Sequence, residues 1–181
     1  MRNFYRLAHG VDVVPLMHQL SLNPDLWDQN TLRTTHPGTP HSDVSDCWVF
    51  FNQVDPANPA ATIDALQTYS YEAWTRLPAL RPLIFDFMRR VEAVQLGRVI
   101  ITKLPPGKVI TPHVDQGAPV EYYRRYQLAL QSRPGALFTI EGETVNFRDG
   151  ELWWINNRAE HSVVNNSDES RIVIILDARP E

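Results

Sequence analysis

The second half of the chain is a series of short segments that are rich in apolar and β-branched residues. Turn-forming runs such as Pro105-Pro106-Gly107 and Asp149-Gly150 separate these segments. Short apolar or alternating segments between turn signals are typical of β-strands. We therefore expect strands after residue 97 at 98–104, 109–113, 125–131, 136–141, 144–147, 151–155, 161–165 and 171–178.

The first half of the chain is less regular, and residues 1–60 are rich in turn-forming residues. We expect one strand in this part, at 47–53. Apolar residues at helical spacing then predict two helices, over about 61–74 and 83–94. The breaks between these elements are expected at the runs 36–41 and 55–59 and at Pro78 and Pro82.

Short strands at regular intervals indicate a β-sandwich or a barrel, with the preceding helices covering one face of a sheet. The length of 181 residues is that of one domain. We therefore expect a single mainly β (α+β) domain over 1–181. Residues 98–180 would form its catalytic core, and residues 1–97 would supply strands, loops and supporting helices, with the N-terminal segment as a lid or wall.

Composition narrows the possible functions. The formal net charge of −4 offers no basic footprint for nucleic acid. Lys103 and Lys108 are the only lysines, so the positive charge is nearly all arginine, which suits two-pronged binding of carboxylates.

Cys47 is the single cysteine, which excludes a disulfide framework and a multi-thiolate zinc site. With no long apolar run, we expect a soluble cytoplasmic protein without a membrane contact.

Three residues suggest a metal site. His113 and Asp115 are two positions apart, so in an extended segment their side chains point the same way. If His161 comes from a neighbouring strand, the three form the two-histidine, one-carboxylate triad of non-haem Fe(II) oxygenases. The alternative is a turn or a hydrogen-bonded pair, because His-x-Asp alone is a common pattern.

Arg171 suggests an anion site. It opens the run 171–177, which is apolar on both faces and is therefore expected to be a central strand. A buried arginine is costly unless an anion meets it. A bound dicarboxylate is the favoured partner, and a structural pair with Asp177 or a nearby glutamate is the alternative.

Several runs in the second half resemble the aspartyl/asparaginyl β-hydroxylase family. The resemblance covers about 98–180 and rests on the segments 104–107, 112–113, 125–130, 149–153 and 161–177. It implies a double-stranded β-helix, a cupin-like jelly roll. It also implies a dioxygenase that uses Fe(II), 2-oxoglutarate and O₂ to hydroxylate a C–H bond.

The resemblance also implies roles for individual residues. His113 and His161 match the family's metal-binding histidines, and Arg171 matches the arginine that binds the distal carboxylate of 2-oxoglutarate. Thr102 and Arg125 fall at further cosubstrate-contacting positions. A β-favouring residue and a surface charge are their respective alternatives.

Two positions depart from the family's animal namesake. Asp115 supplies a carboxylate ligand that this enzyme lacks, and Gln127 replaces a histidine. With these changes we still expect the metal and the cosubstrate of the family. We do not extend the expectation to an aspartyl or asparaginyl substrate.

The substrate is expected to be a small molecule or a peptidyl residue, and its identity stays open. Candidate substrate residues are Trp27, Arg33, His41, Asp46, Trp48 and Arg158, although the apolar strand around Trp48 favours the core for this residue. A cupin-type enzyme or sensor without oxygenase activity, or a β-sandwich without metal, are the alternative functions. Only a dicarboxylate cosubstrate would give both Arg171 and Thr102 a task.

Overall fold

Two antiparallel sheets form the body of the protein in the computed structural model, which describes residues 1–55 and 57–181. The larger sheet has seven strands in the order β1-β9-β6-β11-β4-β2-β3. Its strands are β1 (Phe4–Ala8), β2 (Ser45–Phe51), β3 (Tyr69–Ser70), β4 (Ala93–Leu104), β6 (Arg124–Gln131), β9 (Leu152–Ile155) and β11 (Arg171–Pro180). The smaller sheet has the order β5-β10-β7-β8, with β5 (Val109–His113), β7 (Ala136–Ile140), β8 (Glu143–Val145) and β10 (His161–Asn165).

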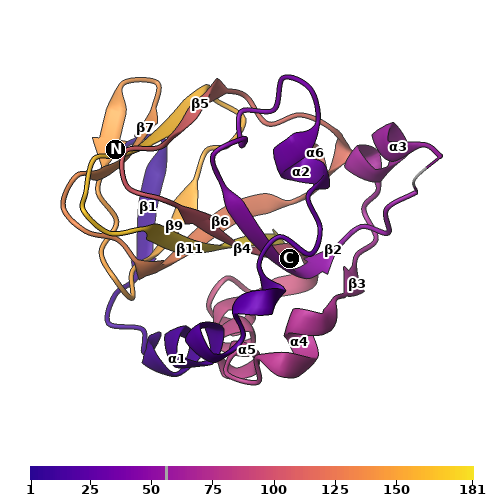
Figure 1. The fold of residues 1–181 in the computed structure, drawn as a ribbon, viewed down its shortest axis with the longest axis horizontal. Helices are drawn as coiled ribbons and strands as arrows, with labels where there is room; N and C mark the ends of the chain where they lie inside the picture. Colours follow the sequence, from indigo (N-terminus) through magenta and orange to yellow (C-terminus); the bar gives the residue numbers. More distant parts are fainter. Residues whose placement is uncertain (56) are drawn as a thin grey trace.

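Three helices cover the outer face of the larger sheet. Figure 1 shows α1 (Val14–Leu22), α4 (Glu72–Arg76) and α5 (Leu80–Arg90) together on one side of the strands. Buried residues such as Leu16, Ile84 and Phe87 pack there against Ile101 and Leu128 of the sheet. The short elements are the 3₁₀ turn η1 (Pro24–Leu26), α2 (Leu32–Thr35), α3 (Pro59–Asp64) and α6 (Ala118–Tyr122). Among the described residues, no helix has the length and apolar character needed to cross a membrane.

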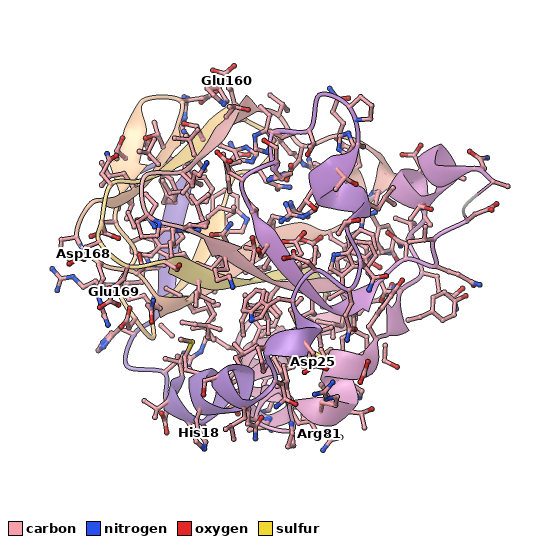
Figure 2. All side chains as sticks on the ribbon, in the orientation of Figure 1. His18, Asp25, Arg81, Glu160, Asp168 and Glu169 are labelled. Atoms are coloured by element: carbon pink, nitrogen blue, oxygen red, sulfur yellow. The ribbon has the colours of Figure 1, made fainter. Side chains whose placement is uncertain are left out.

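A second apolar cluster fills the space between the two sheets. Ile100 and Val173 of the larger sheet and Phe138 and Val163 of the smaller one belong to it. Most ionisable side chains lie elsewhere, and those of His18, Arg81, Glu160, Asp168 and Glu169 reach the periphery in Figure 2. The polar groups that do lie between the sheets therefore require a specific explanation.

The expected strands are confirmed to within a few residues, and so are the two-sheet arrangement and the jelly-roll class. The strand expected at 47–53 is β2, displaced toward the N-terminus. Several elements of the first part have no counterpart among the expected ones, including β1, α1, η1 and α2. β1 pairs with β9 and β2 pairs with β4, so residues 1–97 contribute strands to the larger sheet as well as helices. The run 55–59 includes residue 56, which lies outside the described residues.

The helix expected over 61–74 is wrong. This stretch contains the end of α3, then β3 and the start of α4. The buried Asn52 side chain donates to the carbonyls of Ala65 and Gln67, both at 2.8 Å, and the Tyr71 N–H donates to Val49 O. These tertiary hydrogen bonds hold the backbone extended, so they override the local helical spacing.

The second helix begins and ends earlier than expected, as α5 over Leu80–Arg90. Pro82 lies in its first turn, where a missing N–H costs no helical hydrogen bond. Glu92 has a positive φ of 52° and ends the helical path before β4.

Two glycines provide a test of the packing between the segment that follows β1 and the turn before β9. Gly150 and Gly142 have φ angles of 75° and 81°. A Cβ on Gly150 would lie 2.6 Å from Val11 O, whereas Gly142 has no neighbour within 4 Å. We expect Gly142→Ala to lower the free energy of unfolding by about 1 kcal/mol and Gly150→Ala by about 3 kcal/mol, since only the second adds a steric conflict. Urea unfolding measures both, and equal losses would contradict the expectation.

Candidate metal centre

The three expected metal ligands come together between the two sheets. His113 ends β5 and His161 begins β10, and the antiparallel register places them opposite each other. Asp115 follows β5 by two residues. Its Oδ1 atom lies 3.6 Å from His113 Nε2 and 3.9 Å from His161 Nε2. One donor atom from each of the three residues lies within 4.8 Å of the other two.

Backbone carbonyls orient both imidazoles. His113 Nδ1 lies 2.7 Å from Thr111 O, and His161 Nδ1 lies 2.9 Å from Ala159 O. A carbonyl oxygen only accepts, so each Nδ1 carries the proton and each Nε2 presents its lone pair on the side of Asp115. Burial lowers the pKa of His161, which favours the neutral, metal-binding form of this imidazole.

One atom of the cluster is unsatisfied. His113 Nε2 is buried and has no hydrogen-bond partner in the described part of the chain. A buried nitrogen without a partner is unfavourable unless a ligand uses its lone pair. Two imidazoles and a carboxylate converging on one point are a donor set for a divalent transition metal. The residues present therefore fit such an ion.

Asp115 directs only one of its two oxygens toward the histidines. Its Oδ2 atom accepts from Arg125 Nη1 at 2.5 Å and from Asn157 Nδ2 at 2.9 Å. Burial alone raises the pKa of this carboxyl group. The charge of Arg125, the two imidazoles and the Asn157 hydrogen bond outweigh burial and hold the pKa well below its usual range, so Asp115 stays ionised.

Arg125 is occupied by protein carboxylates. Besides Asp115, it binds Asp177 through two hydrogen bonds of 2.8 Å, from Nε and from Nη2. Burial lowers the pKa of this guanidinium, but the two carboxylates outweigh burial and raise it above its usual value. The expected role of Arg125 as a cosubstrate contact stays a prediction.

Arg171 has a different environment. It is 3% exposed, and its Nη2 donates to Gln127 Oε1 at 2.9 Å. The rings of Phe138 and Phe147 lie 5.7 and 5.6 Å from the guanidinium. No ion pair to a carboxylate is found for it among the described residues, because Asp177, the alternative partner, binds Arg125. Burial lowers the pKa of Arg171 to about 10, well above neutrality, so a positive charge faces the cavity without a counterion.

The N-terminal part contributes a second arginine–aspartate pair. Arg33 of α2 binds the buried Asp46 of β2 through Nε and Nη2, at 2.7 and 2.6 Å. The same Nη2 donates a hydrogen bond to the Thr102 hydroxyl at 3.4 Å. Thr102 is 5% exposed and pairs with Asp46 across β4 and β2. The structure thus links these three candidates in one group, of which Arg33 and Thr102 line the cavity.

His41 closes the cavity beside the triad. Its ring stands edge-on to the ring of His113, with centroids 4.9 Å apart. Burial, aided by the charge of Arg33, lowers the pKa of His41 to about 2, so this imidazole is neutral. The cavity lined by His41, Arg33, Thr102, the triad and Arg171 has a volume of about 30 Å³, which is room for about one water molecule.

Three substrate candidates lie outside this cavity. Trp48 stacks on Phe51 with centroids 3.9 Å apart and belongs to the core between the sheets. Trp27 lies under the Lys103 ammonium at 4.4 Å. Arg158 donates to Val120 O through Nε and Nη2, at 3.1 and 3.0 Å, and so caps the end of α6. The structure does not bring these side chains to the triad.

Two polar residues of the site were not among the candidates. Asp177 shares the inward face of β11 with Arg171, and the alternation of that strand was the signal that could have found it. Asn157 lies in the connection between β9 and β10. No local pattern marks it, because its contact with Asp115 depends on how two separate loops meet.

Two antiparallel sheets enclosing a His-Asp-His cluster define a jelly-roll protein of the kind that includes metal-dependent oxygenases and cupins. The comparison with protein families is more specific. A family model described as aspartyl/asparaginyl β-hydroxylase matches residues 26–180. The chain belongs to this family of hydroxylases.

Solved structures share the fold. A 2OG-Fe(II) oxygenase-family oxidoreductase from Burkholderia pseudomallei has a TM-score of 0.61 and 14% identity, over 98% of this chain and 84% of that one. A prolyl hydroxylase from Trichoplax adhaerens, solved with a hypoxia inducible factor peptide, has a TM-score of 0.60 and 11% identity, over 98% and 83% of the two chains. A prolyl-4-hydroxylase from Pseudomonas putida has a TM-score of 0.53 and 13% identity, over 99% and 93%.

A curated relative resembles part of the sequence. L-proline cis-3-hydroxylase 1 from Streptomyces sp is 29% identical over 89 residues, which are 48% of this chain and 30% of the relative. The matched segment thus spans less than a third of that protein's length.

The triad leads to a direct test of metal binding. We expect the purified protein, freed of metal, to bind Co(II) or Mn(II) in calorimetry. His113→Ala should weaken binding by more than the roughly 100-fold that loss of an outer-shell partner costs, because it removes a ligand itself. His36→Ala is the matched control, since His36 is exposed on a loop. Equal affinities for the two variants would contradict the assignment.

Proposed function

We propose that the protein is an Fe(II)- and 2-oxoglutarate-dependent dioxygenase that hydroxylates a C–H bond of an amino acid, a peptidyl residue or a related small molecule. One observation carries the proposal: among the described residues, a metal donor set whose His113 Nε2 has no hydrogen-bond partner lines the same cavity as a buried arginine, Arg171, that makes no ion pair with a carboxylate. Membership of a hydroxylase family supports the reaction class.

His113, Asp115 and His161 would hold the metal ion. When bound, Fe(II) supplies the activation of O₂ that is coupled to conversion of 2-oxoglutarate into succinate and CO₂ and places one oxygen atom in the substrate C–H bond. The residues of the chain hold the metal at one point, keep the imidazoles in the metal-binding tautomer and exclude bulk water.

Arg171 would bind the carboxylate of 2-oxoglutarate that lies away from the metal. A guanidinium forms two parallel charge-assisted hydrogen bonds with a carboxylate, and these are strongest when they are desolvated. Gln127 would keep the guanidinium in place from the other side, and the Thr102 hydroxyl would donate a further hydrogen bond. The bound dianion would also offset the uncompensated charge of Arg171.

The substrate would approach past Arg33, which is held by the buried Asp46, and past His41. A cavity of about 30 Å³ is smaller than 2-oxoglutarate, so binding requires side chains at its mouth to move. Arg33 and His41 lie on the short helix α2 and on the connection that follows it, outside both sheets. They are the side chains whose displacement disturbs the sheets least.

Succinate release tests the proposed reaction. We expect the Fe(II)-loaded protein to convert 2-oxoglutarate slowly alone and faster when the true substrate is present in a panel of amino acids and peptides. Asp115→Ala should abolish this turnover, because it removes the anionic ligand of the metal. Metal binding without succinate release under any condition would instead favour the cupin-type alternative.

The affinity for 2-oxoglutarate tests Arg171 separately. Charge-assisted hydrogen bonds are worth about 1.5–3 kcal/mol, so Arg171→Met should raise the KM for 2-oxoglutarate by about 10- to 150-fold. Arg171→Lys should give a smaller increase, because it keeps the charge and loses the two-pronged geometry. Arg133→Met, which changes an exposed arginine bound to Asp149 and Glu169, is the control. An unchanged KM in Arg171→Met would refute the assignment.

A further inference from the structure

We infer that Arg125 is a positioning residue, which is clamped by Asp177 and holds Asp115 so that one carboxylate oxygen faces the two histidines. The inference rests on the proposed metal centre. It gives Arg125 a different task from the cosubstrate contact that the family resemblance implies.

The two oxygens of Asp115 have separate partners. Oδ2 receives both hydrogen bonds, from Arg125 Nη1 at 2.5 Å and from Asn157 Nδ2 at 2.9 Å. Oδ1 receives none of these and lies 3.6 and 3.9 Å from the Nε2 atoms of His113 and His161. Rotating the carboxylate would break two hydrogen bonds in a buried site, so the outer donors select which oxygen is offered to the metal.

Arg125 is itself held on the side away from Asp115. Its Nε and Nη2 atoms form the two-pronged pair with Asp177, and the two residues are direct neighbours across β6 and β11. The side chains are 16% and 3% exposed. The sheet register fixes the Cα positions of Arg125 and Asp177, and the two hydrogen bonds to Asp177 fix the plane of the guanidinium. Arg125 Nη1 can therefore reach Asp115 from one direction only.

The Asp115 loop is fixed from a second side. The Asp115 N–H donates to Asn157 O at 3.3 Å, while the Asn157 side chain holds Oδ2. Asn157 thus aligns the backbone and the carboxylate together, and Arg125 supplies the charge. This arrangement matches the outer partners that usually orient a metal-binding carboxylate.

Charge balance gives the same assignment. Asp115, Asp177 and the guanidinium of Arg125 sum to one net negative charge, which a divalent cation complements. Without Arg125, the carboxylates of Asp115 and Asp177 would both lie buried without this counterion, which is unfavourable. Arg125 therefore keeps Asp115 available to a metal, whereas Arg171 holds no carboxylate in the part of the chain that the structure describes.

The test uses Co(II) as a probe of the metal-free protein, so that it needs no turnover. Calorimetry gives the Co(II) affinity, and the visible absorption of bound Co(II) reports coordination geometry. The variants are Arg125→Met, Arg125→Lys and Asp177→Asn. Arg133→Met is the matched control, because Arg133 also binds two carboxylates, at 2.7 and 3.0 Å, but does so on the surface. Circular dichroism establishes that each variant is folded.

We expect Arg125→Met to weaken Co(II) binding by about 10- to 100-fold and to change the absorption spectrum. Arg125→Lys should recover part of the affinity, and Asp177→Asn should weaken binding by about 10-fold with Arg125 still present. The dissociation constant of 2-oxoglutarate, measured with Co(II) saturating, should stay unchanged in all three variants. If Arg125→Met does not fold, the Co(II) affinity of Asp177→Asn decides the test.

An unchanged Co(II) affinity and spectrum in the folded Arg125 and Asp177 variants would overturn the inference. The inference would also be overturned if the Arg125 variants bound Co(II) normally but 2-oxoglutarate poorly. That result would make Arg125 a cosubstrate contact. Failure of the proposed function looks different: the wild-type protein would bind Co(II) through the triad and release no succinate. The effect of Arg125 on the metal site would then still be measurable.

Discussion

The cost of removing charge from water is the constraint on which the arrangement of the site depends. Asp115, Arg125, Asp177 and Arg171 all lie between or beside the two sheets, with little access to solvent. A buried ion is tolerated only when partners replace its water. The first three residues satisfy one another in a chain of hydrogen bonds, and the fourth has an amide oxygen and two aromatic rings. This difference separates the charges that are paired within the chain from the one that favours an incoming anion.

Strand register decides which polar groups reach the site. On β6, Arg125 and Gln127 face inward, while Tyr126 and Leu128 pack against the helical layer. A slip by one residue would exchange these two sets and place charges under α5. The pairing of His161 with His113 is likewise set by the register of β10 and β5. The chemistry of the site therefore depends on sheet pairings that the apolar residues enforce.

Much of this could be predicted from sequence, because the strands after residue 97 carry regular turn signals. The triad follows from the same pattern, since His113 and Asp115 are two apart and His161 opens another strand. The run 61–74 was misassigned because Asn52, distant in sequence, captures its backbone. Trp27 and Arg158 suit a substrate site by chemical type, but their side chains contact Lys103 and the Val120 carbonyl outside the cavity. Such contacts depend on how distant segments meet, which local periodicity does not encode.

Arg125 and Arg171 show why residue type alone leaves function undetermined. Both begin or nearly begin a central strand, both face inward, and both carry a charge that burial disfavours. Asp177 makes the distinction: it lies opposite Arg125 in the sheet and six residues along β11 from Arg171. An arginine that is already bound on two sides gains little from a third carboxylate, whereas an unpaired one gains the full electrostatic benefit of an incoming anion. Ligand-binding and positioning roles thus follow from where the neighbouring carboxylates lie, and that is fixed by strand pairing.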